Sequence, residues 1–505
     1  MKQTKRWAAL LGLGFALLLL TTQSLAAAPA RDEVADLDAF IQQAMKEYQV
    51  PGAAVAVVKD GKVILAKGYG VRDINKTDKV DENTIFQLAS VTKTLTGAAA
   101  GTVVDSGKLD FDTPIFNYLP EFVGYDPYMT RWLTMRDLLA MRTGWHEFSG
   151  DAVDSFGYDR AEILHRMRYF KPRYSLREVA QYSNPGFFVA GEVAGRASGM
   201  SWNELVQKNI FTPLGMTRSG TVVKGLKDDN LSANHAWVDG KIQTVAPDIL
   251  DTTGAASSGT STAADMAKFM LMYLGKGTSN GKTVLKPETV ADIFKRSMVA
   301  ELSFSETPPI GEATGFYYGL GVGSYDYANH QVIEKGGALS GIRTVLVLVP
   351  EKNIGIFVAS NMNLTVFPEA VRAYFLNQQF GVDALTGQKE IFALNSQIQK
   401  LITPPPAPTN PGKFLGTLQS LVGVYENDYY GRVAILLDGE NLKAEFGPAK
   451  YPATITHWDN GAFHMLFPGA TQAPALVTFT IGEDGTADSF THQEFGVFTR
   501  VKAKE

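Results

Sequence analysis

Three short peptides hold the residue types that could do chemistry: Ser90–Lys93 (Ser-Val-Thr-Lys), Tyr182–Asn184 (Tyr-Ser-Asn) and Lys335–Gly337 (Lys-Gly-Gly). In the first peptide a hydroxyl and an amine stand three residues apart, a spacing that places both on one face of a helix. A serine hydroxyl is a poor nucleophile until a neighbouring base takes its proton. An amine that burial and nearby cations hold neutral can act as that base. The spacing therefore predicts a nucleophile, Ser90, paired with a base, Lys93.

Each of these patterns also occurs elsewhere in the chain, so their context decides how they are interpreted. Ser279–Lys282 has the same Ser-x-x-Lys spacing, but its Asn and Gly are typical of a turn. Ser90 instead opens an apolar segment, 88–104, that is typical of a buried helix. The start of a helix favours a developing negative charge. Lys335 precedes two glycines, where a substrate backbone could approach a strand closely.

The segments around these peptides predict an α+β fold. An amphipathic helix at 31–50 precedes a hairpin whose turn is Asp60–Gly61, a strong signal for two residues in a tight turn. Helical patterns fill the middle of the chain at 134–141, 176–182, 201–211 and 262–274, and β-branched strands follow at 332–335, 344–349 and 354–360. We expect one antiparallel sheet that holds both ends of this unit, with helices packed on its faces.

A proline-rich segment separates this unit from a second one. Five prolines lie between residues 404 and 411, which is typical of an extended spacer. Beyond them, short apolar runs alternate with Gly, Asp and Pro turns, which predicts a small all-β barrel or sandwich. We expect an α+β unit at 29–385, a linker at 386–413 and an all-β domain at 414–505.

The N-terminus has the three-part pattern of a signal peptide. Lys2, Lys5 and Arg6 precede an apolar run at 7–20, and small residues follow at 26–28. We expect residues 1–28 to be removed and the protein to be periplasmic or secreted; the alternative is an uncleaved N-terminal anchor. Removing 1–28 changes the formal charge from −5 to −8, which argues against a nucleic-acid partner. No later stretch is apolar enough for a membrane span, and the chain has no cysteine for a disulfide or a lipid anchor.

The chain resembles the serine β-lactamases and penicillin-recognising D,D-peptidases, most closely the class C β-lactamase-like branch. The resemblance covers about 34–380 and includes the order Ser-x-x-Lys, Tyr-x-Asn and Lys-x-Gly. Further matching stretches lie outside these motifs, at 50–52, 138–144, 210–216 and 261–267. The C-terminal β unit resembles the lipocalin-like domain found on some members. The resemblance implies a β-lactamase/transpeptidase-like antiparallel sheet flanked by helices.

The resemblance also implies a role for each site residue. Ser90 would attack an acyl carbonyl. Lys93 would take the proton of Ser90 or tune the pKa of its hydroxyl. Tyr182 would pass a proton to the leaving group and later help to activate water. Asn184 would orient the substrate and bond to Lys93. Lys335 would attract a substrate carboxylate, and Gly337 would let the substrate approach. The backbone N–H groups of Ser90 and Ala338 would form the oxyanion hole.

The third motif departs from the pattern of most relatives in ways that bear on the substrate. Many relatives, carboxylesterases in particular, lack a cation where this chain has Lys335, so the substrate is expected to carry a free carboxylate. Gly336 stands where β-lactamases usually have Thr, which weakens the expectation of efficient β-lactam hydrolysis. The favoured function is a hydrolase of D-amino-acid peptides, including peptidoglycan fragments, or of β-lactams.

Three alternatives stay open from the sequence. The first is a carboxylesterase with the same machinery, and the second is a non-hydrolytic binder of peptidoglycan or penicillin. A binder has no need of a Ser–Lys pair, which argues against the second. The third is metal-dependent hydrolysis, but the seven histidines form no His-Glu-x-x-His motif. We therefore expect no metal and no cofactor.

Overall fold

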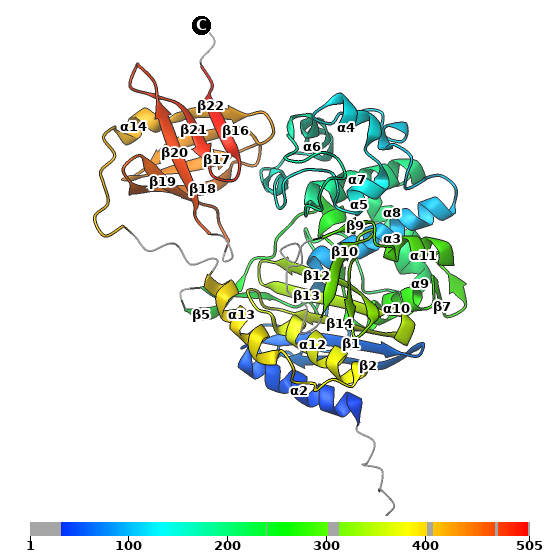
Figure 1. Cartoon of the computed structure of the whole chain (residues 1–505). Helices are drawn as coiled ribbons and strands as arrows, with labels where there is room; N and C mark the ends of the chain where they lie inside the picture. The colour runs from blue at the N-terminus through cyan, green and yellow to red at the C-terminus, as the bar shows by residue number, and fades with distance from the viewer. Residues whose placement is uncertain (1–31, 239, 301–312, 401–407, 470–472, 503–505) are drawn as a thin grey trace, which may run out of the picture.

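The computed structural model describes residues 32–238, 240–300, 313–400, 408–469 and 473–502 of the 505-residue chain (Figure 1). An α+β unit is followed by a closed β-barrel. The expected signal peptide, 1–28, lies outside the described residues, and so does 401–407 in the expected linker. Within the described part of the chain, no helix combines the length and hydrophobicity needed to cross a membrane.

An eight-stranded antiparallel sheet forms the centre of the α+β unit. Its strands, in spatial order, are β2 (Lys62–Gly70), β1 (Gly52–Lys59), β14 (Ile354–Ser360), β13 (Ile342–Val349), β12 (His330–Leu339), β11 (Gly323–Tyr327), β10 (Thr314–Tyr318) and β9 (Met298–Val299). Strand β1 pairs with β14, so one sheet does hold both ends of the unit, as predicted. The Asp60–Gly61 turn is also confirmed, with both residues at positive φ.

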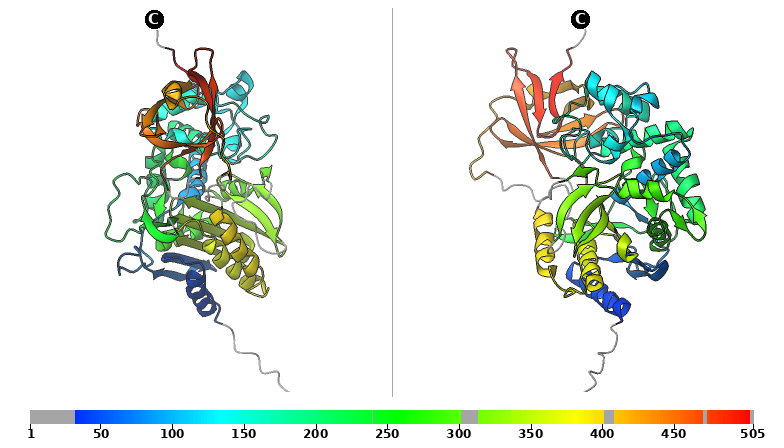
Figure 2. Two further views of the ribbon diagram at one scale, coloured as in Figure 1. Left: turned by 90° about the vertical axis from the view of Figure 1, so that its left-hand side faces the viewer. Right: turned by 45° about the vertical axis from the view of Figure 1, so that its right-hand side comes forward.

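Helices cover both faces of this sheet, and strand β1 shows why. Ala53, Val55 and Val57 belong to the core shared with α2 (Glu33–Glu47) and α12 (Phe367–Phe380). The alternate residues of β1 belong to the core shared with α3 (Thr92–Asp105) and α10 (Ala263–Leu274). Successive strand side chains point to opposite faces, so a continuous apolar strand is buried on both. Figure 2 shows α2 and α12 side by side on one face.

The remaining elements of the unit vary in length, from two-residue strands to a helix of 15 residues. The α-helices are α4 (Pro127–Trp132), α5 (Met135–Leu139), α6 (Arg160–Arg166), α7 (Asn184–Ser198), α8 (Trp202–Val206), α9 (Thr212–Leu214), α11 (Pro287–Phe294) and α13 (Gln388–Lys400). Tighter or wider helical turns are η1 (Ala89–Val91), η2 (Ile115–Asn117), η3 (Asp151–Val153), η4 (Met167–Tyr169), η5 (Gln207–Phe211), η6 (Gly254–Ala256) and η8 (Pro350–Lys352). Two-stranded pairs are β3 (Phe86–Gln87) with β6 (Thr260–Ser261), β4 (Asn234–Val238) with β5 (Lys241–Val245), and β7 (Thr278–Ser279) with β8 (Lys282–Thr283).

One sequence prediction about a helix was wrong. The segment 176–182 is irregular, and the helix α7 begins after it at Asn184. The side chain of Ser183 accepts a hydrogen bond from the Gly186 N–H and Pro185 lies in the first turn, both of which favour a helix start here. The expected linker, 386–413, contains α13, whose Ile391 is buried and whose Phe392 ring meets Tyr48 at 5.3 Å.

The C-terminal unit is a closed eight-stranded barrel, which confirms the predicted all-β domain. A short helix, α14 (Leu418–Leu421), precedes it. Its strands are β15 (Gly423–Asn427), β16 (Gly431–Asp438), β17 (Asn441–Phe446), β18 (Tyr451–Asp459), β19 (Ala462–Leu466), β20 (Ala475–Ile481), β21 (Ala487–His492) and β22 (Gly496–Arg500). Strand β15 pairs with β22 and closes the barrel, so no strand edge is left unpaired.

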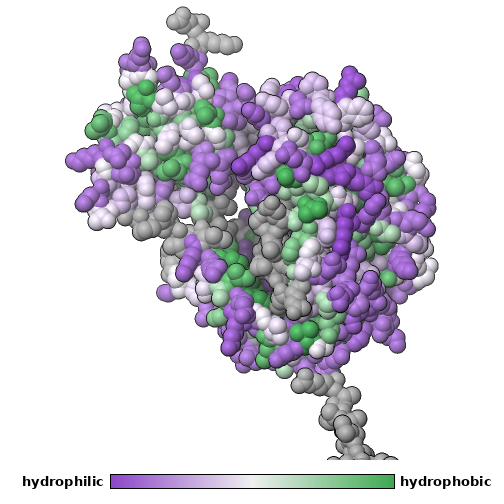
Figure 3. All heavy atoms as spheres, in the orientation of Figure 1, coloured by the Kyte–Doolittle hydropathy of each residue, from purple (hydrophilic) through white to green (hydrophobic). Residues whose placement is uncertain are grey.

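The barrel packs directly against the α+β unit. Phe156, from the loop before α6, is fully buried, and its ring stacks on Phe446 of β17 at 4.7 Å. Other aromatic rings of the barrel surround Phe156 at 6.0–6.4 Å, namely Tyr430, Tyr451, Phe467 and Phe495. The two units therefore share one hydrophobic core. Figure 3 shows that the outer face in this orientation is mostly hydrophilic on both units, with small hydrophobic areas between.

Candidate active site

Ser90 lies on the turn η1, between the short strand β3 and the helix α3. Its neighbour Ala89 has φ +49°, a left-handed conformation that residues other than glycine rarely adopt and that often marks functional turns. The turn is held from both sides: the Leu88 N–H donates to the Gly259 carbonyl at 2.7 Å, and the Thr344 hydroxyl donates to the Leu88 carbonyl at 2.8 Å. Ser90 is only 7% exposed. Ser90 is thus nearly buried, on a turn that hydrogen bonds hold in place.

Lys93 follows one turn later on α3 and is fully buried. Its Nζ lies 3.1 Å from Ser90 Oγ, 2.6 Å from Asn184 Oδ1 and 2.9 Å from the Ala256 carbonyl oxygen. The amide and carbonyl oxygens can only accept, so Lys93 must donate two N–H groups to them. A neutral amine then has its lone pair left for the Ser90 hydroxyl proton. The geometry therefore allows Lys93 to act as a general base.

Tyr182 also contacts the serine. Its hydroxyl is 2.5 Å from Ser90 Oγ, and the residue is 2% exposed. The amines of Lys93 and Lys335 lie over its ring, at 4.8 and 4.9 Å from the centroid. The ring of Tyr182 thus lies beside two amines, one from each of the other two motifs. Phe148, which is half-exposed, stacks on the same ring at 4.8 Å.

Asn184 connects Lys93 to a carboxylate that the sequence did not point to. Its Nδ2 donates to Asp151 Oδ2 at 2.7 Å, and this bond turns its Oδ1 toward Lys93. Burial raises the pKa of Asp151 to about 6, against the opposing effects of the Asn184 hydrogen bond and the charge of Lys93. Neither Asp151 nor Phe148 belongs to a recognisable motif: Phe148 lies in a loop, and Asp151 begins the turn η3 that follows it. The sequence signal beside them is the glycine at position 150, whose φ of +83° is a conformation that favours glycine.

Strand β12 brings the third peptide against the serine. Lys335 is 6% exposed and reaches Tyr182 as described. A Cβ added at Gly337 would lie 2.6 Å from the Leu88 carbonyl oxygen and 2.8 Å from the Ser90 backbone nitrogen. Only glycine permits this approach. Ala338 follows on the same strand, paired with Arg343 of β13, so the two proposed oxyanion donors come from elements in close contact.

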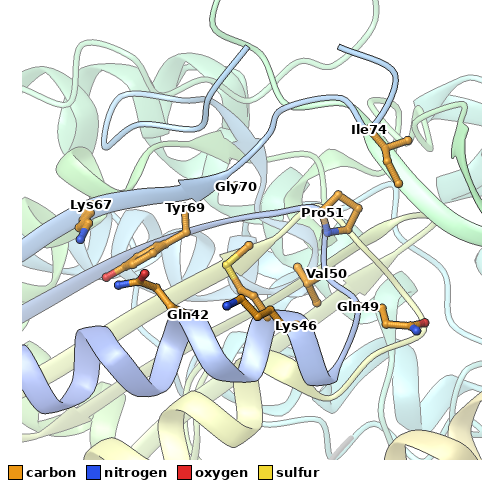
Figure 4. Close-up of a pocket in the computed structure, with 10 residues that line it drawn as sticks. Gln42, Lys46, Gln49, Val50, Pro51, Lys67, Tyr69, Gly70 and Ile74 are labelled. Carbon is orange, nitrogen blue, oxygen red and sulfur yellow. The ribbon is translucent and has the colours of Figure 1, made fainter. Parts of the chain in front are cut away.

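The structure thus brings Ser90, Lys93, Tyr182, Asn184 and Lys335 together. The second Ser-x-x-Lys match does not join them: Ser279 and Lys282 pair across the β7–β8 hairpin, as the turn signal predicted. A cavity of about 450 Å³ lies elsewhere, between α2, β2 and the loop that follows it (Figure 4). None of the five site residues lines that cavity.

Comparison with known proteins places the chain in a family. The model of the beta-lactamase family matches residues 37–379, so the chain belongs to the beta-lactamase family. A second model, described as a domain of unknown function (DUF3471), matches residues 405–502, which include the barrel.

Individual relatives are distant in sequence. The chain is 23% identical to Unguisins hydrolase ungD of Aspergillus violaceofuscus over 445 residues, which cover 81% of this chain and 77% of that protein. It is also 23% identical to Protein flp of Staphylococcus aureus, with 67% of this chain and 65% of that protein covered. The chain thus spans about two thirds of the length of Protein flp.

Solved structures share the fold. The octameric penicillin-binding protein homologue from Pyrococcus abyssi has a TM-score of 0.62 at 20% identity and covers 92% of this chain and 100% of its own. SurE has a TM-score of 0.58 at 20% identity and covers 93% of this chain and 99% of its own. A second SurE structure, with D-Leu, has a TM-score of 0.53 at 18% identity. These likenesses show the β-lactamase-like fold together with its C-terminal unit.

Proposed function

We propose that the protein is an exported serine hydrolase that forms an acyl-enzyme on Ser90. One observation supports this most strongly: Ser90 Oγ lies 3.1 Å from the amine of Lys93 and 2.5 Å from the phenol of Tyr182. A hydroxyl held between a buried amine and a phenol has both a base for its own proton and an acid for a leaving group. Export is proposed from the basic and apolar N-terminus alone.

The proposed reaction has two steps. Ser90 Oγ attacks the carbonyl carbon while its proton passes to Lys93 or Tyr182, and the C–N bond of the substrate then breaks as the leaving amine takes a proton from Tyr182. Water, deprotonated by the same pair, then attacks the carbonyl carbon of the ester. The C–O bond to Ser90 breaks, the serine oxygen takes a proton back from the pair, and the acid leaves. The N–H groups of Ser90 and Ala338 are the proposed oxyanion donors, and loss of one such donor costs about 3–4 kcal/mol of barrier.

The proposed substrates are peptides with D-amino acids at a free C-terminus, with β-lactams as their mimics. The buried amine of Lys335, beside Tyr182, supplies a cation that a substrate carboxylate would pair with. Two similar proteins are compatible with this class: one is named a hydrolase of unguisins, and one was solved with D-Leu. Gly336 offers no hydroxyl beside the carboxylate, so β-lactam turnover is expected to be slow.

Substrate preference is tested by comparing kcat/KM for a peptide ending in D-Ala-D-Ala with kcat/KM for a short neutral acyl ester. We expect the peptide to be preferred. We expect Lys335→Gln to raise the KM of the peptide by about tenfold or more and to lower kcat/KM for the peptide more than for the ester, because only the peptide has a carboxylate that loses its partner. Preference for the ester in the wild type, with no effect of Lys335→Gln on the ratio, would identify a carboxylesterase instead.

A further inference from the structure

The barrel reaches the active site through one turn, between β15 and β16. Tyr429 donates its hydroxyl to the Gly150 carbonyl at 3.0 Å, and the Tyr430 hydroxyl accepts from the Gly150 N–H at 3.1 Å. Both polar groups of the Gly150 backbone are therefore held by the barrel. The ring of Tyr429 also stacks on Phe170 of the α+β unit at 4.6 Å. The turn fixes one residue of the loop that runs beside the site.

Gly150 has little freedom to move in this position. It has φ +83°, and an added Cβ would lie 2.8 Å from the Tyr429 hydroxyl and 3.0 Å from Pro185 Cγ. Pro185 is the residue after Asn184, at the start of α7. Gly150 is thus enclosed between the barrel and the helix that carries Asn184. A shift of the barrel turn would move this contact and the residue next to it, Asp151.

From Asp151 a continuous chain of hydrogen bonds leads to the serine. Asp151 Oδ2 accepts from Asn184 Nδ2 at 2.7 Å, Asn184 Oδ1 accepts from Lys93 at 2.6 Å, and Lys93 lies 3.1 Å from Ser90 Oγ. The second oxygen of Asp151 is closed off from solvent and accepts no hydrogen bond within the described parts of the chain. A carboxylate buried in this way is costly to the fold, which points to a role beyond stability.

We propose that the barrel completes the active site: its Tyr429–Tyr430 turn holds Gly150 so that Asp151, as a positioning residue, turns the amide oxygen of Asn184 toward Lys93. The inference rests on the proposed function, since Lys93 is the base whose geometry is set. An asparagine side chain can present either its oxygen or its NH₂ group. An ionised carboxylate accepts only, so Asp151 fixes which end faces Lys93.

The same carboxylate acts on Lys93 through its charge. Lys93 from α3, and Tyr429 and Tyr430 from the barrel, are the ionisable groups that interact with Asp151 across the elements packed on it. The negative charge of Asp151 stabilises the ammonium form of Lys93. Replacing it by a neutral amide therefore favours the neutral amine, and the acid limb of the activity profile moves to lower pH.

The test measures the second-order rate constant for labelling of the full chain by a fluorophosphonate probe between pH 5 and 9. In this reaction a Ser90 Oγ–P bond forms, the P–F bond breaks, the base takes the hydroxyl proton and fluoride leaves. The variants are Tyr429→Phe with Tyr430→Phe, which keeps both rings, and Asp151→Asn and Asp151→Leu. Tyr425→Phe is the matched control, because its hydroxyl bonds to the Leu421 carbonyl inside the barrel.

We expect the labelling rate to fall about tenfold in the double Phe variant, which is the size expected when one or two hydrogen bonds are lost. We expect a larger fall in Asp151→Leu. Asp151→Asn shifts the acid limb to lower pH, which a merely structural residue would not do. Adding the double Phe change to Asp151→Leu gives no further loss.

Three results would overturn the inference while leaving the proposed function intact: wild-type rates in all of these variants, an equal loss in Tyr425→Phe, or independent losses in the combined variant. A wild type that the probe does not label at Ser90 overturns the proposed function itself, and the inference with it.

Discussion

Two groups beside Ser90 Oγ can take its proton, and they differ in distance and in their own hydrogen bonds. Tyr182 is nearer, at 2.5 Å, but Lys93 is the one with two N–H groups already engaged by acceptors, at Asn184 and Ala256. That leaves the amine lone pair directed at the serine, whereas the phenol is placed to donate. Within the proposed reaction, this arrangement favours Lys93 as the group that takes the first proton and Tyr182 as the group that supplies one to the leaving group.

Asp151 predicts a dependence of stability on pH. Its pKa is about 6 in the fold and ordinary, near 3.8, in the unfolded chain. Between these values the folded protein binds a proton that the unfolded chain does not, so the free energy of unfolding decreases as pH rises from about 4 to about 6, and the loss is complete above that. A difference of about two pKa units corresponds to about 3 kcal/mol.

Asp151→Asn should therefore stabilise the protein at pH 8, by about 1–3 kcal/mol, and have little effect at pH 4. Chemical unfolding of both proteins at the two pH values measures this. A stabilisation of the same size at pH 4 and pH 8, or a loss of stability at pH 8, would contradict the burial of an ionised carboxylate at this position.

At the scale of elements, the sequence predicted those turns, helix starts and strands that depend on local patterns. The Asp60–Gly61 hairpin, the Thr262 helix start and the strand β14 follow from turn, capping and β-branched signals. The expected helix at 176–182 does not form, because the helix starts later, where Ser183 caps α7 and Pro185 lies in its first turn. Asp151 could not be predicted at all: its partner Asn184 is 33 residues away, and only the packed loop brings the two together.

The close approach of strand β12 to Ser90 leads to the sharpest prediction at the scale of elements. Gly337→Ala places a methyl group within 2.8 Å of the Ser90 nitrogen and 2.6 Å of Thr344 Oγ1, so the strand must move away from η1. We expect a loss of about 1–3 kcal/mol in stability and a fall of about 100-fold in the labelling rate, because an oxyanion donor moves with the strand.

Thermal unfolding and probe labelling check this change together. Gly461→Ala is the control, since an added Cβ there meets nothing within 4 Å. Normal labelling in Gly337→Ala would show that the approach of β12 to Ser90 is not needed.

At the scale of the whole molecule, the two units share a hydrophobic core. Phe156 belongs to the α+β unit, yet its ring is surrounded by barrel aromatics and stacks on Phe446. The backbone continues the contact: the Ala449 N–H donates to the Phe156 carbonyl at 3.0 Å. The sequence predicted both units and a proline-rich spacer between them. It did not predict the contacts between the units, because these contacts join residues that are far apart in the chain.

Phe156→Ala should lower the stability of both units, by about 3–5 kcal/mol in total, because it leaves a cavity between them. Differential scanning calorimetry of the wild type is expected to show one transition, and the variant two transitions or one at much lower temperature. Two well-separated transitions in the wild type, with the barrel transition unchanged in Phe156→Ala, would show that the units are stable independently.

The most direct test of the account is to find where a fluorophosphonate probe attaches. The account predicts one adduct per chain, on the peptide that contains Ser90, when labelled protein is digested and mapped by mass spectrometry. The adduct is absent in Ser90→Ala and unchanged in Ser279→Ala, which removes the hydroxyl of the second Ser-x-x-Lys match. An adduct that persists in Ser90→Ala, or that maps to another residue of the wild type, would contradict the account.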